Sequence, residues 1–297
     1  MDDQLLLHIY HRLFDPDKAK GDPHPSVGCV YPDAVIVLIY LLACVRGRSP
    51  RWAAARRNWP LWMRRLAGPG YSQFMKRLKT HPVQRLLALL FLEYRDRLPG
   101  SARKYADGKP LTVGGFTKDP DATRGKLPGG GCWGRGYKVH VLADATGAVQ
   151  SFSVTGLAAG EATAMRRLVA WTPLDGAVVR ADSNYDSNPL YAAVADRGGR
   201  LIAPRKKPRT GLGHHPQHAD RLRAIGELEA APEALAAHRR ERARVERTLG
   251  HVTNLPFGLA PLPNFVRRLP RVALWVLAKL TLYHIYLNMR NDNCLAA

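Results

Sequence analysis

The sequence predicts a mixed α/β domain preceded by a small all-helical domain, and three observations lead to this prediction. The 297 residues are 46% hydrophobic, so the chain can bury a core in one large domain or two smaller ones. Apolar residues recur at helical spacing up to about residue 98, whereas short β-type runs appear only afterwards. The breaker cluster Pro99-Gly100-Ser101 separates the two patterns. We therefore expect a helical domain over residues 1–98 and an α/β domain over residues 99–297.

The elements of the first domain follow from apolar spacing and from helix-start signals. A proline at the first helical position and a polar residue just before an apolar run are typical helix starts. We expect helices over Leu5–Phe14 and Val83–Arg97, one from Pro32-Asp33 to Val45, and helices starting near Ser49-Pro50 and Tyr71-Ser72.

In the second domain three strands come first, and helices and strands then alternate. The turn at residues 144–147 joins two of the strands, and the later alternation implies parallel pairing. We expect strands at Lys104–Asp107, Gly136–Asp144, Val149–Thr155, Ala177–Asp182 and Arg200–Pro204, and helices at Glu161–Trp171, Asn188–Arg197 and Pro232–Val252. This order resembles the ribonuclease H-like fold, a mixed sheet flanked by helices. A C-terminal helix over Val272–Met289 is expected to pack on the core or on a second protomer.

The charge of the chain indicates a polyanionic partner. Lys and Arg number 45 against 24 Asp and Glu, a formal net charge of +21. Nucleic acid is the first candidate, because neutralised phosphates supply most of the non-specific affinity for DNA; an anionic membrane surface and ribosomal RNA are the alternatives. The stretch Arg46–Lys79 has ten basic residues and no acidic one. We expect it, with Arg56 and Arg57, to contact DNA phosphates, or else to form a solvated cationic face.

Several other classes of protein are not supported. The four cysteines show no CxxC spacing, which argues against a zinc ribbon or a redox motif. The N-terminus lacks the pattern of a signal peptide. The longest apolar run, Ala34–Val45, is too short to span a bilayer. We expect a cytoplasmic, nucleoid-associated protein with no membrane partner.

Three acidic residues fall at positions where they can converge. Asp107 stands at the end of the first expected strand, Asp182 follows an apolar run, and Glu246 lies on a helix. Carboxylates at the ends of adjacent strands can meet, and a helix packed across them can add a third. Such hard oxygen ligands suit Mg²⁺ or Mn²⁺, and two ions about 4 Å apart can act on one phosphodiester. The alternative is a set of surface carboxylates without function.

The motifs around these residues resemble the catalytic domain of DDE transposases of bacterial insertion sequences. The pieces span Asp107 to Gly250 and read DGKPLTVGGFTKDPDA, GYKVHVLAD, ADSNYDS and RERARVERTLG. The resemblance implies that Asp107, Asp182 and Glu246 are the catalytic metal ligands and that two Mg²⁺ or Mn²⁺ ions bind there. It also implies a ribonuclease H-like fold.

The function implied by the resemblance is cleavage at transposon ends followed by transfer of the freed strand to target DNA. The partner would be double-stranded DNA, and we expect a homodimer in the DNA complex. Two alternatives stay open: a ribonuclease H-like nuclease without strand transfer, and a non-catalytic DNA-binding derivative. Strand-transfer products would separate the first, and metal-dependent nicking the second.

A family motif of Tyr, Arg, Glu and Lys surrounds the glutamate, and this chain keeps only part of it. Arg242 matches the arginine, four residues before Glu246 and so on the same helical face. Arg239 stands at the tyrosine position and Thr253 at the lysine position. Arg239 is a candidate phosphate contact.

Further candidate DNA contacts lie between the three acids. Lys138 and His140 share one face of their strand, and His140 is either a DNA contact or a simple exposed residue. The loop 203–220 carries Arg205, Lys206 and Lys207, and is either a disordered basic loop or an insertion that grips DNA. Asp186 precedes a helix, where a capping role is favoured over metal binding.

Overall fold

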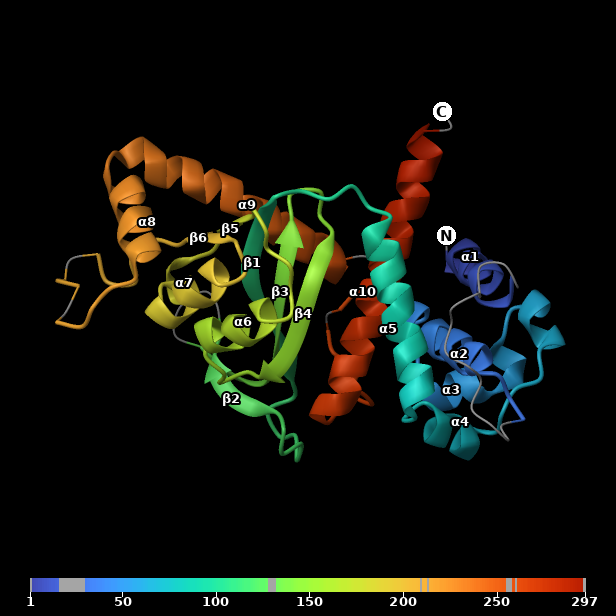
Figure 1. The fold of residues 1–297 in the computed structure, drawn as a ribbon. Helices are drawn as coiled ribbons and strands as arrows, with labels where there is room; N and C mark the ends of the chain where they lie inside the picture. The colour runs from blue at the N-terminus through green and yellow to red at the C-terminus, as the bar shows by residue number, and fades with distance from the viewer. Residues whose placement is uncertain are drawn as a thin grey trace. The chain divides into compact units, whose positions relative to one another are not determined.

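The chain folds into two compact units in the computed structural model (Figure 1). The helical unit comprises Met1–Leu98, Asn254–Leu259 and Ala273–Ala297, and the α/β unit comprises Pro99–Thr253 and Ala260–Val272. The structure describes residues 2–15, 30–127, 132–208, 210–212, 214–254, 258–259 and 261–295.

The helix α2, Asp33–Val45, is the centre of the helical unit. Its residues after Asp33 are apolar, and from Val35 onward all of them are buried. A helix that is hydrophobic on all sides must be surrounded by other elements. The elements of this unit around it are α1 (Asp2–Phe14), α3 (Pro50–Ala54), the 3-10 turns η1 (Arg56–Asn58) and η2 (Leu61–Arg65), α4 (Tyr71–Arg77) and α5 (His81–Asp96).

The C-terminal helix α10, Leu269–Leu295, joins this unit from Ala273 onward, whereas the sequence prediction placed it with the α/β domain. Lys279 donates a hydrogen bond to the carbonyl of Cys44 in α2 at 2.6 Å, and Asn288 donates one to the carbonyl of Tyr94 in α5 at 2.7 Å. The stretch Leu269–Asp292 is long and apolar enough to cross a membrane, but 67% of its most apolar window is buried in the structure, as in a core helix.

A six-stranded mixed sheet is the centre of the α/β unit. In this sheet β3 pairs antiparallel with β1 on one edge and with β2 and β4 on the other, while β5 and β6 continue parallel to β1. The strands are β1 (Arg103–Val113), β2 (Thr123–Lys126), β3 (Trp133–Asp144), β4 (Val149–Gly156), β5 (Val178–Arg180) and β6 (Arg200–Ile202). This topology confirms the predicted mixed sheet of ribonuclease H-like order.

Helices cover both faces of the sheet (Figure 1). On one face Ala106 of β1 belongs to an apolar cluster with Met165 of α6 and Tyr191 of α7. The neighbouring Tyr105 points to the other face, where its hydroxyl donates to Glu241 of α9 at 2.8 Å. The helices are α6 (Glu161–Val169), α7 (Asn188–Ala195), α8 (Ala219–Glu229) and α9 (Pro232–Asn254), with the 3-10 turn η3 (Ser183–Tyr185) before α7.

Three elements differ from the sequence prediction. The strand β1 does not end at Asp107 but continues to Val113, because its turn-type residues 108–110 stay paired with β3. Neither β2 nor α8 was predicted, and α8 occupies the end of the segment that we had read as loop 203–220. The extension of β1 matters for the site, because β5 pairs with β1 only as far as Tyr105. Past that residue the edge of β1 toward β5 is open.

Candidate active site

Asp107 lies on the part of β1 that extends past its pairing with β5. The N–H of Gly108 donates to its carboxylate at 2.8 Å, and 17% of its side chain is exposed. Burial raises the pKa of Asp107 from 3.8 to about 6, against the lowering effects of that hydrogen bond and of Arg242. The protein therefore holds a carboxylate here without fully compensating its charge, as is common at functional sites.

Asp182 follows β5 directly and caps the short turn η3. Its carboxylate accepts the N–H of Asn184 at 2.8 Å. Burial raises its pKa, and the charge of Glu161 raises it further. One carboxylate on β1 and one just past the end of the neighbouring β5, both with raised pKa values, form an acidic centre that a cation would stabilise.

Glu246 reaches the site from α9 and is paired with Arg242. The Arg242 guanidinium lies 2.5 Å from the Glu246 carboxylate and 3.8 Å from that of Asp107. Glu246 is the most open of the three acids, with 55% of its side chain exposed. Arg242 thus stands between the glutamate and the aspartate that the family motif brings together.

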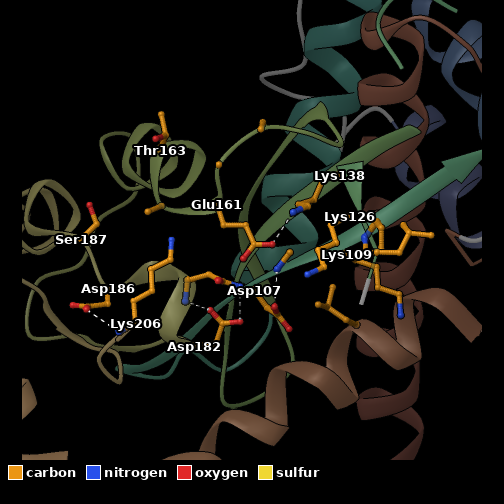
Figure 2. A pocket seen from close by; sticks show the side chains of 18 of the residues that line it. Asp107, Lys109, Lys126, Lys138, Glu161, Thr163, Asp182, Asp186, Ser187 and Lys206 are labelled. Carbon is orange, nitrogen blue, oxygen red and sulfur yellow. Dashed lines mark hydrogen bonds and ion pairs between the residues drawn. The ribbon is translucent and has the colours of Figure 1, made fainter. Parts of the chain in front are cut away.

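A cavity of about 990 Å³ joins these residues (Figure 2). It is lined by Asp107, Asp182 and Glu246, and also by Arg242 and Lys206. Within the described residues no three His, Cys, Asp or Glu side chains already converge on one point. The oxygen ligands that Mg²⁺ and Mn²⁺ require are nevertheless present around one pocket.

Sequence reasoning missed two residues of this site. The sequence predicted Glu161 only as the first residue of a helix, yet it lines the cavity and pairs with Lys138 at 2.7 Å. Tyr185 was not singled out, yet it is fully buried and its pKa is raised by burial and by the charges of Glu161, Asp107 and Asp182. Local pattern gave no signal for either, because only the packing of α6 against β1 and η3 brings them to the carboxylates.

Both readings of His140 were wrong. The residue is neither an exposed side chain nor placed for a DNA contact, because none of it is exposed. Its Nε2 lies 2.9 Å from the hydroxyl of Thr155. Burial lowers the pKa of His140 to about 4, so the ring is neutral at physiological pH. Lys138, on the same face, lines the cavity but is occupied by its ion pair with Glu161.

The basic segment after β6 is partly anchored. Arg205 pairs with Glu229 of α8 at 3.4 Å, whereas Lys206 and Lys207 are exposed. The backbone N–H of Lys206 donates to Asp186 at 3.0 Å. The loop 203–220 includes residues 209 and 213, which lie outside the described residues.

Asp186 does not cap α7 as predicted. No side-chain capping bond is present at the start of that helix, whose N-cap is Ser187. Instead both carboxylate oxygens accept hydrogen bonds from the guanidinium of Arg221 in α8, at 2.6 and 2.7 Å. The partner comes from 35 residues further along the chain, so no local pattern could have identified it.

The remaining candidate contacts are exposed arginines. Arg239 lines a second cavity of about 590 Å³, next to Arg242 and Glu246. Arg56 and Arg57 lie in the turn η1 of the helical unit, and Arg56 also donates to the carbonyl of Arg64 at 3.1 Å.

Fold and site together define an α/β protein with an acidic pocket beside the central strand of a ribonuclease H-like sheet. Residues 105–284, more than half of the chain, match the family described as Transposase DDE domain. The chain therefore belongs to the DDE transposase family, as its motifs predicted. This family implies a DNA substrate and in general uses divalent metal ions. No curated protein and no solved structure matches the chain.

Proposed function

We propose that this protein is a transposase that cuts DNA at transposon ends with divalent metal ions and transfers the freed strand to target DNA. The observation that carries the proposal is that Asp107, Asp182 and Glu246 line one cavity in a chain of the DDE family. Its substrate is double-stranded DNA, both end and target. It works as a homodimer on DNA, at the nucleoid in the cytoplasm.

The three acids are suited to hold two Mg²⁺ or Mn²⁺ ions. The raised pKa values of Asp107 and Asp182 reflect carboxylates that burial has deprived of compensating water. Bound ions supply Lewis-acid activation of the attacking oxygen and stabilise the charge on the leaving oxygen. Glu246 can join them only by leaving Arg242, and the freed guanidinium can then bind a DNA phosphate.

The proposed reaction proceeds in two in-line displacements at one site. In the first, water forms a bond to phosphorus at the transposon end, the bond from phosphorus to the 3′ oxygen breaks, and that oxygen leaves as a 3′-hydroxyl. In the second, the 3′-hydroxyl attacks a target phosphodiester and displaces another 3′ oxygen. The residues of the chain position the DNA and the acidic centre, so no covalent protein intermediate is needed.

Binding of the ends is assigned to the helical unit. Of the ten basic residues in Arg46–Lys79, nine are exposed, and only Arg77 is buried. Exposed arginines and lysines without acidic neighbours in sequence suit phosphate contact. Affinity for DNA should fall steeply with salt, since each neutralised phosphate releases about 0.9 counterion.

The test is a plasmid assay for cleavage and joining with the full chain, in Mg²⁺ and in excess chelator. Asp107→Asn, Asp182→Asn and Glu246→Gln should each lower cleavage by more than about 100-fold, beyond what outer-shell changes cost at metal sites. Glu233→Gln, an exposed change on the same helix α9, is the matched control and should cut normally.

Three outcomes contradict parts of the proposal. Full cleavage in chelator excludes metal dependence. Normal cleavage by Glu246→Gln removes that residue from the catalytic set. Cleavage without joined products assigns the chain to the nucleases that cut but do not transfer strands.

A further inference from the structure

Glu161 is an acidic residue of the pocket to which the proposed function assigns no role. It is the first residue of α6, only 16% of its side chain is exposed, and it lines the same cavity as Asp107 and Asp182. Figure 2 shows its carboxylate turned toward Lys138, with Asp107 close by. Removing both charges of an ion pair from water costs free energy. A largely buried ion pair in the same cavity as two further carboxylates therefore suggests a functional role.

The backbone of β1 leaves room for this ion pair right beside Asp107. Gly108 is the next residue, and a Cβ on it would lie 3.2 Å from Lys138 Cδ and 3.4 Å from a carboxylate oxygen of Glu161. The first contact is tighter than ordinary van der Waals packing, and the second is at its lower limit. The glycine therefore lets Glu161 and Lys138 approach the strand that carries Asp107.

A buried hydroxyl provides an independent sign that the three acids act together. Tyr185 is fully buried, and among the described residues its hydroxyl has no hydrogen-bond partner. Burial raises the pKa of Tyr185, and the charges of Glu161, Asp107 and Asp182 raise it further. A buried hydroxyl without a partner is unfavourable, and a rearranged carboxylate of the acidic centre would relieve this by accepting its hydrogen.

We propose that Glu161 is a further carboxylate of the metal centre, which with Asp107 and Asp182 receives the first divalent cation, while Lys138 is its counterion in the metal-free protein. This inference rests on the proposed function, because it concerns the same metal centre. On loading, the Glu161 carboxylate turns from Lys138 toward the cation, and the freed ammonium group faces the cavity into which DNA would enter.

The two glutamates of the cavity then have different roles. Glu161 is held close to both aspartates and its charge acts on both of them. Glu246 is 55% exposed and paired with Arg242. Glu161 should therefore govern metal binding by the free protein, whereas Glu246 should matter once DNA has drawn Arg242 away.

The experiment is calorimetric titration of the full chain with Mn²⁺ in the absence of DNA. Glu161→Gln should weaken binding by about 10-fold or more, on the scale of losses at metal sites, and Glu246→Gln should change it little. Glu161→Asp, which keeps a carboxylate, should recover part of the affinity. Lys138→Met should tighten binding, because it frees Glu161.

The matched control is Lys126→Met, which removes the same charge from an exposed lysine of the same cavity. It should tighten binding less than Lys138→Met, and Lys138→Met should lose its advantage in a Glu161→Gln background. Each variant is first shown to be folded by its melting curve in chelator.

Two results would overturn the inference. If Glu161→Gln binds Mn²⁺ as the unaltered chain does while Asp107→Asn is impaired, Glu161 lies outside the metal centre and the proposed function survives. If Asp107→Asn also binds normally, the metal centre itself is misplaced, and both proposals fail together.

Discussion

Two sites of this protein bury charge in opposite ways. In the helical unit the buried Asp33 is paired with the buried Arg77. In the α/β unit Asp107 and Asp182 lie near the further negative charge of Glu161, and burial raises the pKa of both. Buried charges with specific partners hold a fold together, whereas accumulated like charges favour the binding of a cation.

The largest expected effect on stability comes from breaking the buried ion pair of Asp33 and Arg77. Asp33→Ala leaves Arg77 as a buried charge without its carboxylate and should destabilise the helical unit by about 3–5 kcal/mol. The measurement is chemical denaturation followed by tryptophan fluorescence. Asp96→Ala, which breaks an exposed contact with Arg95, is the control. Equal effects of the two changes would mean that burial of the pair is not what matters.

Lys279 should make the stability of the helical unit depend on pH. Burial lowers its pKa from 10.5 to about 8. Between these values the unfolded chain binds the proton and the folded chain does not, so stability rises with pH through this window. Relative to Lys279→Met, the unaltered chain should gain on the order of 3 kcal/mol from pH 8 to pH 10.5. The quantity to compare is the difference in unfolding free energy between the unaltered chain and Lys279→Met. Cys44, whose pKa is raised to about 12, lowers stability with rising pH in both chains, and the difference removes this effect. A difference that is flat with pH would refute the prediction.

Removing the negative charge of Asp107 from the acidic pocket should stabilise the protein. The pKa of Asp107 is about 6 when folded against 3.8 as the ordinary value. A raised carboxyl pKa favours folding only at low pH, and this contribution is lost as pH rises through about 6. In chelator at pH 7.5, Asp107→Asn should therefore be more stable by at most about 2–3 kcal/mol, and the gain should vanish below about pH 4. Destabilisation at pH 7.5 would show that Asp107 is compensated after all.

Exposed ion pairs should show the smallest effect. Arg46 contacts Asp3 at 2.6 Å, but 64% of the Asp3 side chain is exposed. Asp3→Ala should change stability by less than about 1 kcal/mol, and the change should shrink in high salt. A loss near that of Asp33→Ala in the same denaturation assay would remove the distinction between buried and exposed pairs.

The parts of the site that the sequence could predict are those marked by local pattern. Asp107 stands at the end of an expected strand, Asp182 follows an apolar run, and Glu246 lies on a helix with its arginine one turn before it. Glu161 could not be assigned, because its meaning depends on where α6 packs against β1. Asp186 was misread for the same reason, since its partner Arg221 comes from α8.

Prediction of the fold was also limited to elements that have a local sequence pattern. The mixed sheet could be predicted from the run of strands and helices along the chain, because its main strands are short apolar stretches separated by turns and helices. The extension of β1 was missed, since Gly108 and Pro110 are turn residues by preference and remain extended only through pairing with β3. The strand β2 is short and contains Gly125, so it has almost no pattern of its own.

The helix α10 has a consequence for how the chain folds during synthesis. Its residues from Ala273 onward belong to the unit formed by the first 98 residues, and Lys279 and Asn288 bind backbone carbonyls of α2 and α5. During synthesis the first helices therefore leave the ribosome long before their last packing partner is made. A fragment ending at residue 98 would expose the face that α10 covers, and a stop codon before the α10 segment would therefore also damage the helices formed by residues 2–98.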